Sequence, residues 1–318
     1  MLTTFESSLS IFLDGTLNWL TENLAYFNLP DDKGLIVEDA PYAIFTPQHK
    51  SFAELVTACS LMNRHSFMRK RQEYKVLLEH IEQEIERSNF TFSMFRRIRF
   101  FYLYLTVYSC LKTCGTKVDA MRVPLQKLLN EHFVDAEEYT PWHQIEMNYY
   151  AELGEFNHRF PTPDNAYRYT SAFLHPSPIH AVRKHGYDLT HALFYLSDFG
   201  RQNLDSLLKH RYRNTCEYTL LLLGLHTRKH GWDLVGELLM CCNFLQCSDS
   251  PLVNLAWQGL FQAQNPQGSV SDRPPEKHEE GEKSSENPDK VDDFTLDHHP
   301  TLVALLSSMS YLSRGNVS

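Results

Sequence analysis

One heptapeptide occurs twice in this chain, and the distance between its copies limits the possible folds. RKHGYDL begins at Arg183 and RKHGWDL begins at Arg228, so the copies lie 45 residues apart and differ only in Tyr187 against Trp232. Each copy leads into a segment whose apolar residues have helical spacing. A repeat of this length corresponds to a pair of helices, and such pairs must stack to bury their apolar faces.

The apolar pattern is helical along almost the whole chain, and no segment alternates for long enough to predict a sheet. The predicted fold class is all-α, an α/α toroid or partial toroid of helical hairpins with a period of about 45 residues around a central cavity. Residues 1–156 are predicted to form an N-terminal helical region, and residues 157–265 and 294–318 the toroid hairpins. Pro300 is expected at the first position of the last helix, which makes HHPTLVALL a third copy of the repeat.

Two segments interrupt the helical pattern. Residues 157–180 contain four prolines and are predicted to form a loop or a lid. Residues 266–293 are predicted to be an acidic, disordered insertion, because they contain no bulky apolar residue between Val270 and Val291.

Composition excludes several classes of protein. The formal net charge is -9, much of it in the acidic insertion, and gives no indication of a nucleic-acid partner. Seven cysteines without a CxxC pair predict a reduced, cytoplasmic protein. No apolar run approaches the ~20 residues that cross a bilayer, so no membrane partner is expected. Basic helices near residues 64–75 and 95–99 are interpreted as solvated faces or as a patch for a carrier protein or an anionic substrate.

The segment FQAQNPQGSV resembles the α/α-toroid families, namely terpenoid cyclases and protein prenyltransferase β-subunits. Gln264, Gly268 and Ser269 match the Gln-x-x-Asp-Gly-Ser-Trp turn of those families, and Gln267 and Val270 depart from it. The resemblance implies a toroid fold.

HHPTLVALLSSM follows that turn and resembles the next inner helix of the same families, which opens with a His-Thr pair. In the prenyltransferases this His is a zinc ligand beside an Asp-x-Cys, so the resemblance implies His299 as its counterpart. The Asp-x-Cys is absent from this chain, and the nearest fragment is NTC with Cys216. His299 also precedes Pro300, and at a helix N-terminus the macrodipole would keep its ring neutral.

A second resemblance is carried by YDLTHALFYLSDFG, GWDLVGELL and HPTLV. Together they resemble a bacterial family of unknown function that is found beside natural-product biosynthesis genes. This resemblance covers roughly residues 140–312. It implies a place in secondary metabolism and brings no established chemistry.

A stripe of polar residues runs along the helix of the first repeat. Asp188, His191, Tyr195 and Asp198 lie at i, i+3, i+7 and i+10, so they share one face of an otherwise apolar helix. Polar groups in such a setting pair with one another or face a cavity. The second repeat has Gly236 in place of His191, so the architecture does not require this histidine. It is predicted to be catalytic, and a histidine satisfied by a neighbouring aspartate is the alternative.

The repeated aspartates, Asp188 and Asp233, are expected to cap helix N-termini. In a toroid the inner helices run parallel, so these two residues, His191, Glu237 and His299 would approach one another at one rim. Two histidines with carboxylates suit zinc or iron, with His191, His299 and Glu237 as ligands. A metal-free acid–base pair and a purely structural cluster are the alternatives.

Two functions remain open. The first is a tailoring enzyme of a bacterial secondary-metabolite pathway that acts on a small-molecule or peptide intermediate. Its catalytic residues would be His191 and His299, as ligands or acid–base groups, with Asp188, Tyr195 and Asp198 beside them. The alternative is a non-catalytic helical scaffold that binds a peptide or a partner protein.

Overall fold

The computed structural model describes residues 4–30, 47–96, 100–132, 134–136, 138–272 and 290–314. These residues are mostly helical and contain no strand; they include one isolated antiparallel bridge, between Gln264 and Val270. The predicted all-α class is confirmed.

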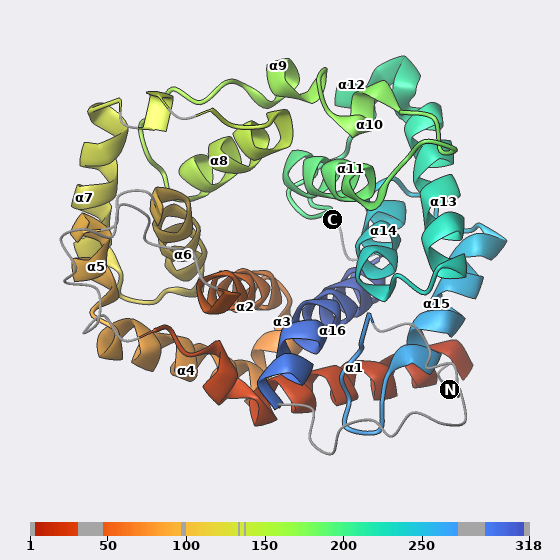
Figure 1. Ribbon diagram of the computed structural model, residues 1–318, viewed down its shortest axis with the longest axis horizontal. Helices are drawn as coiled ribbons and strands as arrows, with labels where there is room; N and C mark the ends of the chain where they lie inside the picture. Colours follow the sequence, from red (N-terminus) through yellow and green to blue (C-terminus); the bar gives the residue numbers. More distant parts are fainter. Residues whose placement is uncertain are drawn as a thin grey trace. The chain divides into compact units, whose positions relative to one another are not determined.

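The helices are labelled in Figure 1. Their bounds, in chain order, are α1 Thr4–Glu22, α2 Pro47–Asn63, α3 Ser66–Arg69, α4 Gln72–Arg87, α5 Phe90–Arg96, α6 Phe101–Cys114, α7 Asp119–Asn130, α8 Pro141–Leu153, α9 Pro163–Tyr167, α10 Ser171–Leu174, α11 Arg183–Leu196, α12 Asp205–Leu208, α13 Tyr212–Arg228, α14 Trp232–Phe244, α15 Pro251–Ala263 and α16 Lys290–Leu312. Short 3-10 turns occur at Leu24–Phe27, Val134–Ala136 and Lys209–Arg211.

The chain forms two compact units. Unit 1 contains the described residues of Met1–Tyr26, His175–Thr190 and Asn203–Ser318, and unit 2 contains those of Phe27–Leu174 and His191–Gln202. The division passes through α11. Each unit contains segments of the predicted N-terminal region, residues 1–156, and of the predicted hairpin region that follows it. The predicted domain ranges and the toroid arrangement remain predictions.

Unit 1 is built around α16, which packs against α14 and α1 (Figure 1). Gly236 allows α14 and α16 to approach closely, because a Cβ added at this glycine would lie 2.6 Å from Cγ1 of Val303. At Gly186 an added Cβ would overlap the side chain of Leu234, so α11 and α14 also approach closely. The glycine that replaces His191 in the second repeat therefore has an architectural reason.

The turn after α15 also belongs to unit 1. Gly268 has a φ of +100°, and a Cβ there would overlap the backbone of Gly15 in α1. The side-chain amide of Gln264 holds the turn, because it donates to the carbonyl oxygens of Phe12 at 2.9 Å and Gly268 at 3.0 Å. The two matching residues Gln264 and Gly268 thus have structural roles in this turn.

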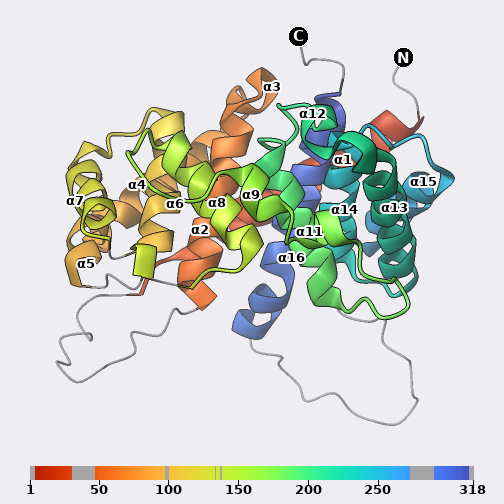
Figure 2. The ribbon, with the colours of Figure 1, turned by 90° about the horizontal axis from the view of Figure 1, so that it is seen from above.

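Unit 2 is centred on α6, which packs against α2 and α8 (Figure 2). Most residues of α6 are apolar and buried, as expected for a helix surrounded by others. It ends at Gly115, which has a φ of +79°, and the amide of Thr116 donates to the carbonyl of Leu111 at 3.2 Å. This is a Schellman cap, the usual role of a glycine at a helix end.

The start of α16 differs from its prediction. The helix begins at Lys290, and Pro300 lies inside it instead of at its first position. Pro300 lacks an amide hydrogen, so the helix loses one internal hydrogen bond there and still continues. Residues 266–272 form the described turn, so this part of the predicted insertion is ordered; residues 273–289 lie outside the described residues.

Ser250 caps the N-terminus of α15, since it accepts a hydrogen bond from the amide of Leu252 at 3.3 Å, with Pro251 next to it. The segment 157–180, predicted as a loop or a lid, contains the short helices α9 and α10.

The two repeat copies occupy different positions in their helices. The first copy lies inside α11, which begins at Arg183. In the second copy Arg228 ends α13, and α14 begins only at Trp232. Each copy leads into a helix, as expected, but the two copies enter their helices differently.

All seven cysteines are free thiols. Within the described ranges, no helix combines the length and the apolar content that crossing a bilayer would require.

Candidate metal centre

Three side chains that can bind metal ions meet inside unit 1. Asp233 and Glu237 are four residues apart in α14 and so share one helix face, and His299 reaches them from α16. One ligand atom from each of the three lies within 4.8 Å of the other two. Both carboxylates are buried, and the His299 side chain is 22% exposed.

The carboxylate of Asp233 has partners on both of its oxygens. Its Oδ1 lies 2.6 Å from Nδ1 of His299. Its Oδ2 accepts a hydrogen bond from the hydroxyl of Tyr187 and lies 3.3 Å from the guanidinium of Arg183. A carboxylate can only accept, so Nδ1 of His299 carries the proton in this arrangement.

Residues of α11 and of the turn after α15 support the two carboxylates from outside. Arg183 forms an ion pair with Asp272, and Asp272 accepts a hydrogen bond from the amide of Asp233 at 3.3 Å. The hydroxyl of Thr190 donates to Glu237. One polar network therefore connects helices α11, α14 and α16 with the turn after α15.

The electrostatics of the network favour a negative charge on Asp233. Burial alone raises the pKa of Asp233, but His299, Tyr187 and Arg183 together outweigh it and hold the pKa well below its usual value. The pKa of Tyr187 is raised by burial and by the charge of Asp233, so its hydroxyl stays a donor. The residues around Asp233 keep it ionised, which is the form that binds a metal.

The set of donors fits a divalent cation. Two carboxylates and one imidazole are ligands of zinc and of iron, and three protein ligands leave a coordination position for water or substrate. Ligands of bound zinc lie about 3 to 3.5 Å from one another, so the group would contract by up to about 1.5 Å on binding. Without a metal, Asp233 would orient His299 for proton exchange at Nε2.

The predicted ligands are placed in two different units. His299 and Glu237 belong to the group described above, whereas His191 lies in unit 2. Asp233 completes the group. The sequence placed it near Glu237 and His299 but did not identify it as a ligand, because its repetition was interpreted as a helix cap. The cap is wrong: Gly231 is the N-cap of α14, and Asp188 instead pairs with Lys184 at 2.7 Å. The i, i+4 spacing of Asp233 and Glu237 was the available signal.

The argument that placed His299 at a helix N-terminus is also wrong. Because α16 begins at Lys290, His299 lies well inside the helix and away from the positive end of its dipole. Its position beside Asp233 depends on the packing of α14 against α16.

His191 and Tyr195 belong to a second polar cluster, in unit 2, around the buried Glu146 of α8. Oε1 of Glu146 accepts hydrogen bonds from the hydroxyls of Tyr195 and, at 2.9 Å, Tyr102. The His191 ring packs edge-on against Trp142, with centroids 4.7 Å apart. Burial raises the pKa of Glu146 above its usual value, although Tyr195, His191 and Tyr102 oppose the shift.

Asp198 follows the end of α11 and has a structural partner. It accepts hydrogen bonds from Arg64 at 2.8 Å and from the hydroxyl of Tyr149 at 2.9 Å. Arg64 and Tyr149 are also bonded to each other at 2.6 Å. The stripe Asp188, His191, Tyr195 and Asp198 therefore meets partners from several different elements.

Comparison with known proteins gives one match. A family model described as a domain of unknown function (DUF6895) matches residues 13–309, a wider range than the resemblance at 140–312. No curated protein and no solved structure matches the chain.

Proposed function

We propose a metal-dependent enzymatic function for this chain, which belongs to the DUF6895 family of domains of unknown function. The observation that carries the proposal is the buried group of Asp233, Glu237 and His299. The metal would be zinc or iron, held by these three side chains. It would supply a Lewis acid or an activated water, which are the usual contributions of such ions.

The chain's own residues have distinct parts in this proposal. Asp233 is held ionised and in place by Tyr187 and Arg183, and Thr190 holds Glu237. Because both carboxylates are buried, bound metal would be shielded from bulk water on that side. His299 is partly exposed, so substrate would approach from its side of the group.

The substrate class comes from the sequence resemblances. We propose that the substrate is a small-molecule or peptide intermediate of a bacterial secondary-metabolite pathway in the cytoplasm. An intermediate that is attached to a carrier protein would be delivered by that protein. A scaffold that binds a peptide or partner protein is the second candidate. It is favoured by large apolar side chains that are exposed in unit 1 just before its α11 segment, namely Ile179 and Val182.

The metal content of the natively purified protein tests the first candidate. We expect about one equivalent of zinc or iron in the wild type, and its loss in His299→Ala and in Glu237→Gln. Asp188→Asn is the matched control, since Asp188 has the repeat position of Asp233 but pairs with an exposed lysine. The control should keep its metal.

Two outcomes would contradict the proposal. One is a wild-type protein that holds no metal and takes up neither zinc nor iron(II) on reconstitution. The other is metal retained in folded His299→Ala and Glu237→Gln proteins. Either result would leave the scaffold as the better explanation, with the buried group as a structural network.

A further inference from the structure

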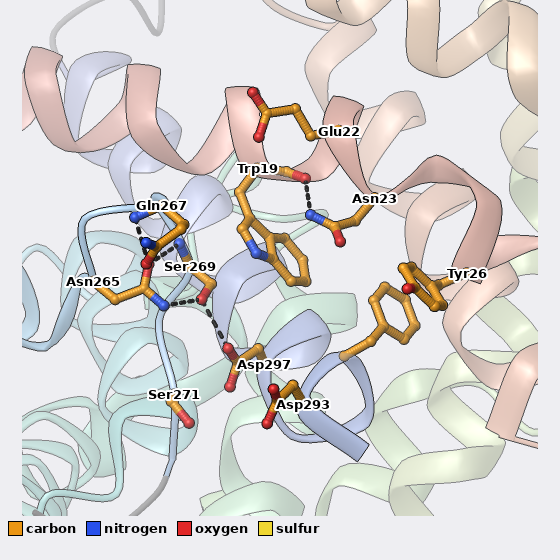
Figure 3. Close-up of a pocket in the computed structure, with 11 residues that line it drawn as sticks. Trp19, Glu22, Asn23, Tyr26, Asn265, Gln267, Ser269, Ser271, Asp293 and Asp297 are labelled. Carbon is orange, nitrogen blue, oxygen red and sulfur yellow. Dashed lines mark hydrogen bonds between the residues drawn. The ribbon is translucent and has the colours of Figure 1, made fainter. Parts of the chain in front are cut away.

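Unit 1 contains a second site, separate from the metal centre. A cavity of about 570 Å³ opens between the end of α1, the turn after α15 and the first turns of α16 (Figure 3). It is lined by Trp19, Glu22, Asn23, Tyr26, Asn265, Gln267, Ser269, Ser271, Asp293, Phe294 and Asp297. Its volume is within the range of small-molecule sites.

Aromatic rings form one wall of this cavity. The rings of Trp19 and Phe294 are nearly parallel, with centroids 5.9 Å apart and an interplanar angle of 10°. Tyr26 stacks on the same Phe294 at 5.2 Å. The faces of aromatic rings carry partial negative charge and attract cations, most strongly those of tryptophan.

The charged residues that line the cavity are all acidic. They are Glu22 of α1 and Asp293 and Asp297 of α16, and among the described residues no lysine, arginine or histidine lines the cavity. Asp293 and Asp297 are four residues apart and so lie on one face of α16. Figure 3 shows both in the part of the cavity below the Trp19 ring.

One carboxylate oxygen in the cavity wall is buried and unsatisfied. Oδ2 of Asp297 accepts a hydrogen bond from the hydroxyl of Ser269 at 2.8 Å. Oδ1 of the same carboxylate is buried and has no hydrogen-bond partner among the described residues. A buried acceptor without a donor is costly, so a bound molecule that supplies one would be favoured there.

We propose that this cavity binds a protonated organic amine. The ammonium group would donate an N–H to Oδ1 of Asp297, and its carbon chain would lie against the rings of Trp19 and Phe294. A metal cation would use the carboxylates but gain little from the rings, because hard divalent cations take oxygen ligands. The aromatic wall therefore distinguishes an amine from a metal.

The amine site is independent of the metal centre. Asp297 and His299 are two positions apart in α16. Each position turns the helix by about 100°, so their side chains leave it on nearly opposite sides. A chain that binds no metal would still have this cavity, and a chain that binds no amine would still have the metal ligands.

Calorimetric titration of the full-length protein with benzylammonium tests the proposal, and benzyl alcohol is the neutral comparison. We expect benzylammonium to bind saturably with a dissociation constant below about 10 mM. At the same ionic strength, the dissociation constant of benzyl alcohol should be at least about tenfold higher. This comparison uses only the wild-type protein, so it does not depend on any variant folding.

Two variants locate the binding. Asp297→Asn should weaken the binding of benzylammonium about tenfold and leave the binding of benzyl alcohol almost unchanged, because it removes the charge of the side chain and keeps its shape. Glu217→Gln removes an exposed carboxylate of α13 in the same unit and should change nothing. Equal affinity for the two ligands, no saturable binding, or full binding by folded Asp297→Asn would overturn the proposal.

Discussion

Asp188 and Asp233 occupy the same position in the repeat but have different surroundings. Asp188 is partly exposed and forms an i, i+4 ion pair with the exposed Lys184. Asp233 is buried and bonded to His299, Tyr187 and Arg183. The same residue at the same repeat position therefore contributes very different amounts to stability, since exposed pairs are weak and buried charges depend on their partners.

Substitution of each aspartate by asparagine measures this difference. We expect Asp233→Asn to lower the free energy of unfolding by about 2 to 4 kcal/mol, because the change removes a buried charge to which His299, Tyr187 and Arg183 are bonded. Asp188→Asn should change the free energy by less than about 0.5 kcal/mol. Urea denaturation of the metal-free proteins gives both values, and equal costs would show that the Asp233 network is not a stabilising one.

Glu146 gives a prediction about pH. Its pKa is raised in the folded state by burial, so its contribution to stability is fully present below its unfolded pKa of about 4.3 and is lost as the pH rises through the folded pKa. A glutamine at this position would keep an acceptor for Tyr102 and Tyr195 without this penalty. The wild type should therefore lose stability relative to Glu146→Gln as the pH rises, by up to about 1.4 kcal/mol per pH unit.

Chemical denaturation at several pH values between about 5 and 8 measures this difference. His143 and His191 lie beside Glu146 in both proteins, so the difference between the proteins measures Glu146 together with its effect on these two histidines. Glu131→Gln, an exposed position of unit 2 whose partner is a lysine, is the control and should follow the wild type. A difference that is constant with pH would mean that Glu146 is not ionising in this range.

At the residue scale, the sequence predicted part of the candidate metal centre. Glu237 and His299 were identified from residue type and from the resemblance to toroid families. Asp233 was expected nearby but was not identified as a ligand, because repetition suggested a cap. A repeat pattern does not show that one copy is buried among bonding partners and the other pairs with an exposed lysine. Glu146 was missed because its partners Tyr102 and Tyr195 come from distant parts of the sequence.

At the scale of helices, the approach of α14 to α16 depends on one glycine. A Cβ on Gly236 would lie 2.6 Å from Cγ1 of Val303, whose branched side chain has little freedom to move. Gly224, in the middle of α13, has only ordinary contacts, with the nearest atoms of Leu252 at 3.6 Å. The two glycines form a matched pair inside helices of the same unit.

Alanine substitution should have opposite effects at these two positions. Gly236→Ala should cost about 1 to 3 kcal/mol, because it pushes α14 and α16 apart. Gly224→Ala should stabilise by up to about 1 kcal/mol through the higher helix propensity of alanine. Thermal unfolding measures both, and stabilisation by Gly236→Ala would show that the two helices tolerate a wider separation.

Helix ends were predictable where local chemistry decides them. Gly115 and Ser250 are caps, and their signals depend on the residue itself and its near neighbours. The start of α16 was not predictable in this way. Pro300 is typical of a first helical position, but tertiary packing carries the helix through it, at the cost of one backbone hydrogen bond.

At the scale of the whole chain, the sequence predicted the all-α class from its helical periodicity. It did not predict that unit 1 combines the first helix of the chain with its last third. Such pairing depends on contacts between segments far apart in sequence, like that of α1 with α16, and periodicity carries no information about them. For the same reason the group of Asp233 and His299 spans 66 residues of sequence.

The two units should respond differently to metal. Zinc that binds only the folded form of the centre adds about 2.7 kcal/mol to the stability of unit 1 at a hundred times its dissociation constant. Amide hydrogen exchange is slowed where stability rises, so we expect added zinc to protect α14 and α16. Helices α4 and α6 belong to unit 2 and should exchange at unchanged rates.

Hydrogen-exchange mass spectrometry with and without zinc reads all four helices in one experiment. His299→Ala is the control, in which zinc should protect neither unit. Protection of α14 with α4 unchanged would mean that unit 1 opens without unit 2. Equal protection of α4 and α14 would contradict this prediction, because it would require both units to unfold together in one cooperative step.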